Sequence, residues 1–109
     1  MIKTLTENEN LALSDFKQRL QEKFGDVEMI LFGSKSRGDY DDHSDIDVLV
    51  ILDKPLSNSI EEEIFDIGFD VEMEHNIILG IISYSKESWD YLRNISPFCK
   101  NVIEEGIIL

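Results

Sequence analysis

The sequence predicts an α/β protein in which helices pack on a small mixed sheet of three to four strands. Three observations support this class. Helical and strand-like segments follow one another in the order α-β-β-α-β-α-α. The run IDVLVIL, residues 46–52, is apolar on both faces, as in a covered sheet. Finally, 109 residues of which 42% are hydrophobic are expected to form one domain, residues 1–109, with its own core.

The first half of the chain is expected to supply one helix and two strands. Residues 6–24 form the helix, because the apolar side chains of Leu13, Phe16, Leu20 and Phe24 share one face. Thr6 and Glu9 have the spacing of a capping box, and Gly25 ends the helix. The apolar runs 27–32 and 46–52 are the two strands.

The second half is expected to supply three helices and one strand. Ser59 and Glu62 have capping-box spacing and predict a helix over residues 60–74. The apolar run that follows predicts the third strand, at 77–83. Two more helices are expected, one at 86–93 and one at 98–105, and the latter begins after Pro97 and ends at Gly106.

Charge and composition narrow the classes of partner. The net charge is −13 and the ten Lys and Arg residues form no run. Direct binding of nucleic acid is therefore not expected, whereas metal ions or a basic protein partner fit the acidic balance. The apolar runs are too short to cross a bilayer, and residues 1–10 carry no secretory signal. No membrane association is therefore expected. The single cysteine, Cys99, allows no intrachain disulfide, which fits the expected cytoplasmic location.

The stretch GSKSRGDYDDHSDIDVLV, residues 33–50, carries the candidate site. Gly33 and Gly38 have P-loop spacing, but Asp39 stands where a P-loop has its lysine, so a P-loop is excluded. Asp45 and Asp47 flank Ile46 at the start of a strand, where alternate side chains share a face. Two carboxylates about 7 Å apart along the backbone can bind hard cations such as Mg²⁺.

Gly33 and Ser34 fit the phosphate side of the same site. A glycine lets backbone N–H groups approach a phosphate, and Ser34 adds a hydroxyl donor. If the two strands are neighbours, phosphates at Gly33 lie beside metals at the aspartates. That layout is typical of metal-assisted phosphoryl transfer.

This stretch resembles the minimal nucleotidyltransferase family of the DNA polymerase β-like superfamily, whose signature is Gly-Ser, ten residues, then Asp-x-Asp. The resemblance implies a polymerase β-like core and a Mg²⁺-dependent enzyme that transfers NMP from an NTP, with ATP as the expected nucleotide. It implies that Gly33 and Ser34 hold the triphosphate and that Arg37 assists. Asp45 and Asp47 would be the catalytic carboxylates and would bind two Mg²⁺ ions.

Several other polar residues in the stretch have plainer interpretations. Arg37 can equally be a surface residue that offsets the aspartates around it. Lys35 and His43 are expected to be exposed. The loop or turn residues are Asp39, Asp41 and Asp42. Cys99 is expected to be a small core residue near Phe98.

The sequence departs from the family in one respect. The resemblance implies a third carboxylate on the strand after the intervening helix, where it would act as base, but the segment IILGIIS has none. The nearest carboxylates lie before and after it: Glu72, Glu74, Glu87 and Asp90. Glu74 would serve only if the strand began earlier than residue 77.

The resemblance also leaves three functions open. Because the chain has little beyond the core, the acceptor would be another protein, for example the HEPN-type toxin of a HEPN/MNT toxin-antitoxin pair. The alternative is a catalytically weak or inactive antitoxin or binding module that acts by protein contact. Transfer to a small molecule, as in aminoglycoside-modifying relatives, is a third. The tail EEGIIL, residues 104–109, is free to bind a partner, to form a homo-oligomer or to return to the core.

Overall fold

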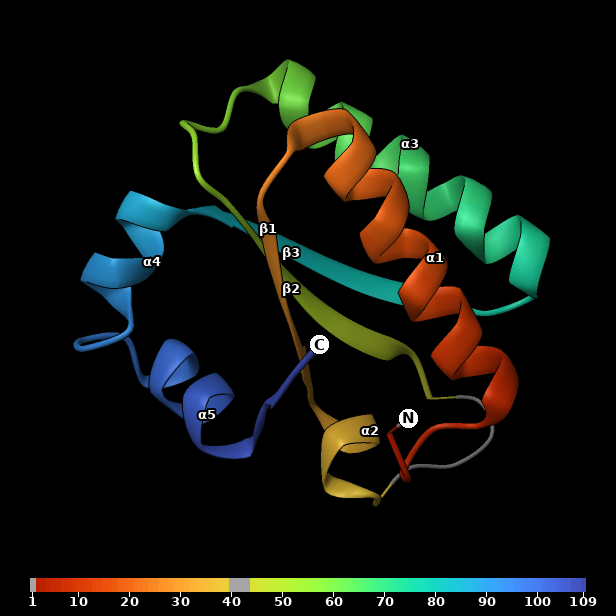
Figure 1. The fold of residues 1–109 in the computed structure, drawn as a ribbon. Helices are drawn as coiled ribbons and strands as arrows, with labels where there is room; N and C mark the ends of the chain where they lie inside the picture. The colour runs from red at the N-terminus through yellow and green to blue at the C-terminus, as the bar shows by residue number, and fades with distance from the viewer. Residues whose placement is uncertain (1, 40–43) are drawn as a thin grey trace.

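Four strands and five helices account for the regular structure of the described residues, 2–39 and 44–109, in a computed structural model (Figure 1). The strands form one sheet in the order β3-β2-β1-β4. They are β1 (Val27–Phe32), β2 (Ile46–Leu52), β3 (Leu79–Ser85) and β4 (Ile107–Ile108). The helices are α1 (Glu7–Phe24), α2 (Ser34–Arg37), α3 (Asn58–His75), α4 (Lys86–Leu92) and α5 (Pro97–Glu105). The predicted mixed sheet with packed helices is confirmed.

The register of the central strands brings the site residues to one end of the sheet. β1 and β2 are antiparallel, and Phe32 at the end of β1 pairs with Asp47 near the start of β2. β2 and β3 are parallel, and Asp47 also pairs with Gly80 on β3. An antiparallel pair thus places the segment after β1 beside the beginning of β2. Asp47 consequently lies between the two neighbouring strands.

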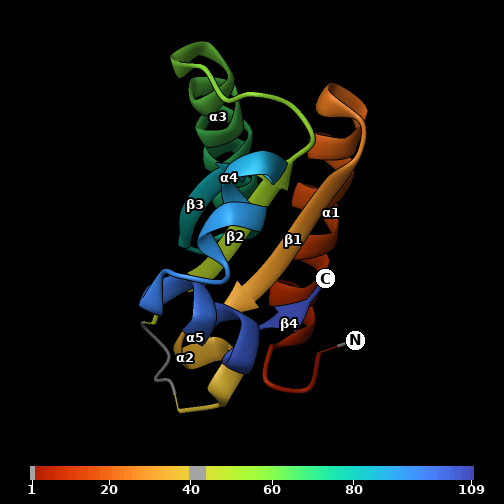
Figure 2. The same cartoon turned by 90° about the vertical axis from the view of Figure 1, so that its left-hand side faces the viewer.

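The sheet has a core on each face. One face packs against α1 and α3, and its centre includes Phe16, Val48 and Ile64. The other face packs against α4 and α5 through Leu49, Trp89 and other residues. Figures 1 and 2 show the pair α1 and α3 on one side of the sheet and the pair α4 and α5 on the other. This double coverage explains why the run 46–52 is apolar on both faces.

Several predicted boundaries are confirmed. α1 has the expected capping box between Thr6 and Glu9 and ends at Gly25. The strands at 27–32 and 46–52 have the predicted limits. The final helix ends before Gly106 as predicted but begins at Pro97, one residue before the predicted start, and Cys99 is buried as expected.

Other boundaries differ from prediction by one or two residues. α3 begins two residues before residue 60, because Ser57 and not Ser59 is the N-cap and its hydroxyl accepts from the Ile60 N–H. β3 begins at Leu79 instead of residue 77 and continues to Ser85, whose hydroxyl caps α4. The one-turn helix α2 was not predicted. The C-terminal tail returns to the sheet as β4, where Ile107 and Leu109 pack against the first core.

No helix among the described residues is both long and apolar enough to cross a membrane.

Candidate functional site

The turn after β1 changes direction at Gly33. Its φ is +75°, a conformation that favours glycine, and it is the N-cap of α2. The Ser36 N–H and the Arg37 N–H both donate to the Gly33 carbonyl, at 3.1 and 3.3 Å, and Gly38 ends the turn in the left-handed region. Ser34 is therefore the first residue of a helical turn, where N–H groups are not used within the helix. This is the backbone geometry expected of a phosphate-binding turn.

The carboxylate of Asp47 is enclosed by the backbones of the two flanking strands. A Cβ added to Gly33 would lie 2.3 Å from Asp47 Oδ2, and one added to Gly80 would lie 2.5 Å from Asp47 Oδ1. Both distances are far shorter than van der Waals contact, so a side chain at either glycine would displace the carboxylate. Gly33 and Gly80 together form a fixed cradle for Asp47.

Asp45 and Asp47 interact electrostatically, and their environments differ. Asp45 is exposed, whereas Asp47 is half-buried. Burial and the negative charge of Asp45 raise the pKa of Asp47, while the positive charge of Arg37 acts in the opposite direction. Ile46 between them is 1% exposed and points into the core, as predicted. The two carboxylates thus form a concentration of negative charge that a divalent cation would relieve.

Arg37 is positioned by two other carboxylates. Its Nε contacts Asp39 Oδ2 at 3.2 Å, and its Nη1 contacts Glu105 Oε2 at 3.0 Å. The hydrogen bonds to Asp39 and Glu105 raise the pKa of Arg37 further. Glu105 belongs to the last turn of α5, so Arg37 joins α2 to the C-terminal helix. Arg37 is exposed and still lowers the pKa of Asp47, which places its charge within electrostatic reach of the site.

The prediction that Lys35 is exposed is wrong. The residue is 3% exposed, and its Nζ lies 2.8 Å from Glu9 Oε2. α2 is a helical turn and not an open loop, and this turn directs Lys35 toward the first turn of α1. Burial raises the pKa of Glu9, but hydrogen bonds from Lys35 and from the Thr6 N–H outweigh it, and the pKa is lowered. Asp39 is exposed as predicted, whereas Asp41, Asp42 and His43 lie outside the described residues.

None of the four nearest acidic residues joins the aspartate pair. Glu72 accepts a hydrogen bond from the Leu79 N–H at 2.8 Å and so supports the start of β3. Glu74 pairs with Arg19. Asp90 pairs with Lys86, and Glu87 lines a pocket at the far end of β3. Because β3 begins later than predicted, Glu74 is further from the strand than the sequence suggested.

A separate cluster of potential metal ligands lies between α1 and α3. Among the described residues, Asp15, Glu74 and His75 are the one group of three whose ligand atoms lie within 4.8 Å of one another. Arg19 and His75 both contact Asp15, at 3.0 and 2.9 Å, and Arg19 also contacts Glu74. Their hydrogen bonds lower the pKa of Asp15. These contacts identify an ion-pair network that ties the two helices together.

Gly80 is the site residue that sequence reasoning missed. A glycine inside an apolar strand often marks close approach of other groups to the backbone, and that signal was present in IILGIIS. The sequence alone does not give the β2–β3 register, so it could not show that the approaching group is Asp47. The register places Gly80 on the strand expected to carry a third carboxylate.

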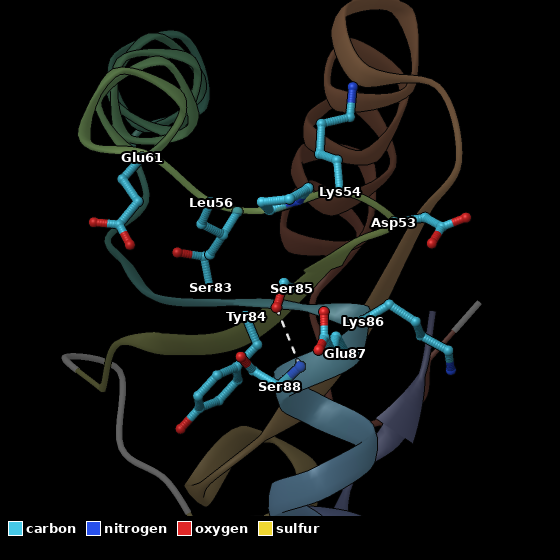
Figure 3. Close-up of a pocket in the computed structure, with 11 residues that line it drawn as sticks. Asp53, Lys54, Leu56, Glu61, Ser83, Tyr84, Ser85, Lys86, Glu87 and Ser88 are labelled. Atoms are coloured by element: carbon cyan, nitrogen blue, oxygen red, sulfur yellow. Dashed lines mark hydrogen bonds between the residues drawn. The ribbon is translucent and has the colours of Figure 1, made fainter.

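A pocket of about 600 Å³ opens at the opposite end of β2 and β3 from the aspartate pair (Figure 3). Asp53, Glu61, Ser83 and Ser85 are among its lining residues. In Figure 3 the side chains of Lys54 and Lys86 point away from each other and do not converge on a common point. The pocket therefore lacks a pair of cations that could bind a polyphosphate, and the aspartate pair remains the better candidate.

Comparison with known proteins identifies the family. Residues 13–109 match the nucleotidyltransferase domain family. A protein of Methanocaldococcus jannaschii, named "Putative protein adenylyltransferase MJ0604", is 34% identical over 104 residues, which cover 94% of this chain and 98% of the relative. A second protein of that organism, with the same description and the designation MJ0141, is 35% identical over 72 residues, covering 66% of this chain and 71% of the relative.

A solved structure supports the same fold. The crystal structure of the toxin-antitoxin MntA-HpeT includes a chain that superposes on this one with a TM-score of 0.59. The two chains are 23% identical, and the match covers 96% of this chain and 72% of that one. The fold, the Gly-Ser turn beside the aspartate pair and the family match agree. This chain belongs to the nucleotidyltransferase domain family and is a nucleotidyltransferase.

Proposed function

We propose that the chain is a Mg²⁺-dependent protein adenylyltransferase that moves AMP from ATP to a hydroxyl group of a partner protein. The observation that carries the proposal is the cradle, in which Asp47 is held between Gly33, at the phosphate-binding turn, and Gly80. The names of the Methanocaldococcus relatives support a protein as the acceptor. In the reaction, the acceptor oxygen forms a bond to the α-phosphorus of ATP. The bond between the α-phosphorus and the oxygen that bridges it to the β-phosphorus breaks, and pyrophosphate leaves.

The residues present fit Mg²⁺. Asp45 and Asp47 supply hard oxygen ligands, and their mutual repulsion and the burial of Asp47 favour a cation. When bound, Mg²⁺ would neutralise charge on the triphosphate and on the leaving pyrophosphate. The turn at Gly33 and Ser34 would hold the triphosphate, and Arg37 would add positive charge at its exposed side. The proton of the acceptor hydroxyl passes to solvent or to a group of the partner, since no third carboxylate joins the pair among the described residues.

The proposed partner is a HEPN-type protein, with this chain as the antitoxin. The solved chain that superposes on this one belongs to the structure of a toxin-antitoxin, MntA-HpeT, and this supports a protein partner. The acidic charge of −13 suits a partner with a basic surface.

A binding module without turnover is the second candidate. The observation that favours it is Gly80, which leaves β3 without a carboxylate beside Asp47. General-base help is typically worth about 10²- to 10⁴-fold in rate, so its loss slows a transfer enzyme without removing its metal and phosphate contacts.

The two candidates differ in what happens to the partner. The full chain is incubated with a purified HEPN-type partner, Mg²⁺ and each NTP in turn, and the partner is weighed by intact mass spectrometry. We expect the partner to gain one AMP with ATP, and Asp45→Asn to abolish the gain. Asp53→Asn is the matched control, because Asp53 is exposed and follows the other end of β2. A partner that stays unmodified but is still neutralised by Asp45→Asn/Asp47→Asn would establish the binding module instead.

A further inference from the structure

Ile78, which directly precedes β3, is an exposed apolar residue beside the aspartate pair. Its carbonyl accepts a hydrogen bond of 2.9 Å from the Ile46 N–H, so Ile78 is adjacent in the sheet to the residue between the two aspartates. Ile77 and Leu79 pack into the first core, and alternation directs Ile78 to the opposite face. Ile78 is 60% exposed. Exposed apolar side chains also occur elsewhere on this protein, for example Met73 and Tyr91, so the position of Ile78 beside the two aspartates, and not its exposure alone, is what matters here.

Asp47 lies on the same face of the sheet as Ile78. Its neighbours Ile46 and Val48 are in the first core, whereas Leu49, two residues on, is in the second. Gly80 pairs with Asp47, and Ile82, two residues further along β3, packs against the second core. Gly80 therefore has no side chain that would separate Ile78 from the Asp47 carboxylate. The three features form a continuous surface from the aspartates to the edge strand.

We infer that Ile78 and Gly80 form the acceptor side of the site, and that Ile78 contacts an apolar side chain next to the acceptor hydroxyl of the partner protein. The inference rests on the proposed function. It assigns to the acceptor a chemistry that the family match does not give, namely a hydroxyl flanked by an apolar residue. Ile78 acts as a specificity-determining residue and takes no part in the bond changes.

The direction of attack supports this assignment. The two oxygens of Asp47 face different strands, Oδ2 toward Gly33 and Oδ1 toward Gly80. In phosphoryl transfer the attacking and leaving oxygens lie on opposite sides of the phosphorus. If pyrophosphate leaves on the side of Gly33 and Ser34, the acceptor oxygen approaches from the side of β3. Ile78 is an exposed apolar side chain on that side of the aspartates, where the residue next to the acceptor hydroxyl would lie.

The experiment compares two synthetic peptides with ATP and Mg²⁺ and the full chain. Both carry one serine, one threonine and one tyrosine, flanked by leucine in one peptide and by glycine in the other. Pyrophosphate release and AMP on the peptide are measured for the unaltered chain, for Ile78→Ser and for Leu11→Ser. Leu11 is the matched control, since it is 56% exposed and lies on α1. The shift in melting temperature with Mg²⁺-ATP shows that each variant folds and binds nucleotide.

We expect the unaltered chain and Leu11→Ser to have a kcat/KM at least about tenfold higher for the leucine peptide, since burying a leucine side chain is worth more than one power of ten. Ile78→Ser should lose that preference through a higher KM for the leucine peptide, with its Mg²⁺-ATP shift unchanged. Equal transfer to both peptides, or a preference that survives in Ile78→Ser, would overturn the inference. Pyrophosphate release without transfer to the leucine peptide would also overturn it, while the nucleotide site stands. Absence of pyrophosphate release with both peptides and also with the purified HEPN-type partner would refute the proposed function itself.

Discussion

Gly33 is under two separate constraints at the scale of a single residue. Its φ of +75° is costly for any residue with a Cβ, and its place beside Asp47 leaves no room for one. Gly25 has a similar backbone, with φ of +81°, but an added Cβ there would meet nothing within 4 Å. A substitution at Gly25 therefore reports the cost of backbone strain alone, whereas a substitution at Gly33 reports that cost together with the displacement of Asp47.

We predict that Gly33→Ala and Gly25→Ala each lower the free energy of unfolding by about 1–3 kcal/mol, because both force alanine into a conformation reserved for glycine. Gly33→Ala should in addition lose the stabilisation by Mg²⁺-ATP, because its Cβ displaces the Asp47 carboxylate. Urea unfolding with and without Mg²⁺-ATP measures both effects. If Gly33→Ala were still stabilised by Mg²⁺-ATP, Asp47 would not be a ligand of the bound Mg²⁺.

At the scale of elements, a buried ion pair ties the turn that holds Gly33 and Ser34 to the first helix. The side chains of Lys35 and Glu9 are 4% and 12% exposed, and Glu9 also accepts from the Thr6 N–H within the capping box. Glu9 thus caps the start of α1 and also holds α2 in place through Lys35. Loss of one partner would leave a charge in a poorly hydrated place, which is more costly than removal of both.

We predict that Lys35→Met destabilises the fold by about 3–5 kcal/mol and that Glu9→Gln/Lys35→Met costs less than Lys35→Met alone. Lys23→Met is the control, since the pair of Lys23 with Glu63 is 3.7 Å long and largely exposed and should be worth less than about 1 kcal/mol. A double-mutant cycle, measured by urea unfolding, gives the coupling free energy between Lys35 and Glu9. Additive effects would mean that the pair contributes nothing as a pair.

The same pair predicts a pH dependence. The pKa of Glu9 is lowered in the folded state, so its contribution is complete above the ordinary value of 4.5 and is lost as the pH falls through the folded-state pKa. The difference in stability between the unaltered chain and Glu9→Gln should therefore shrink on acidification below pH 4.5.

Local sequence signals predicted those elements whose ends are marked by one clear residue. α1 has one capping box and one terminal glycine, and each of the first two strands begins after an aspartate and ends before a glycine or an aspartate. The start of α3 was predicted two residues late, because Ser57 and Ser59 are both suitable caps and the local sequence does not distinguish them. Asp45 and Asp47 were predicted as a pair from strand periodicity, and their place at the start of β2 agrees with that pattern. Gly80 and Glu105 were not predicted, because their nearness to the site depends on strand register and on the return of α5, which no local pattern encodes.

At the scale of the whole molecule, charge is the dominant feature. A net charge of −13 is carried by a body whose extents are 34 × 29 × 20 Å. At low ionic strength the Debye length is about 30 Å, so carboxylates repel one another across the entire molecule. This self-repulsion opposes folding.

We predict that raising NaCl from about 10 to about 150 mM, which shortens the Debye length to about 8 Å, raises the melting temperature by several degrees. The increase should persist in Asp45→Asn/Asp47→Asn. Mg²⁺ at the same ionic strength should add a further increase in the unaltered chain and none in the double variant. A melting temperature that falls with NaCl would show that attractive surface pairs outweigh the repulsion.

The two-residue strand β4 has a consequence for the behaviour of the protein in concentrated solution. It pairs with Ile30 and Leu31, and the Leu109 N–H donates to the Met29 carbonyl at 2.9 Å. The apolar strand β1 would otherwise offer unpaired peptide groups along its outer side, a template on which a strand of another molecule could add. β4 and Leu109 therefore occupy the outer side of β1, a position that would otherwise seed aggregation.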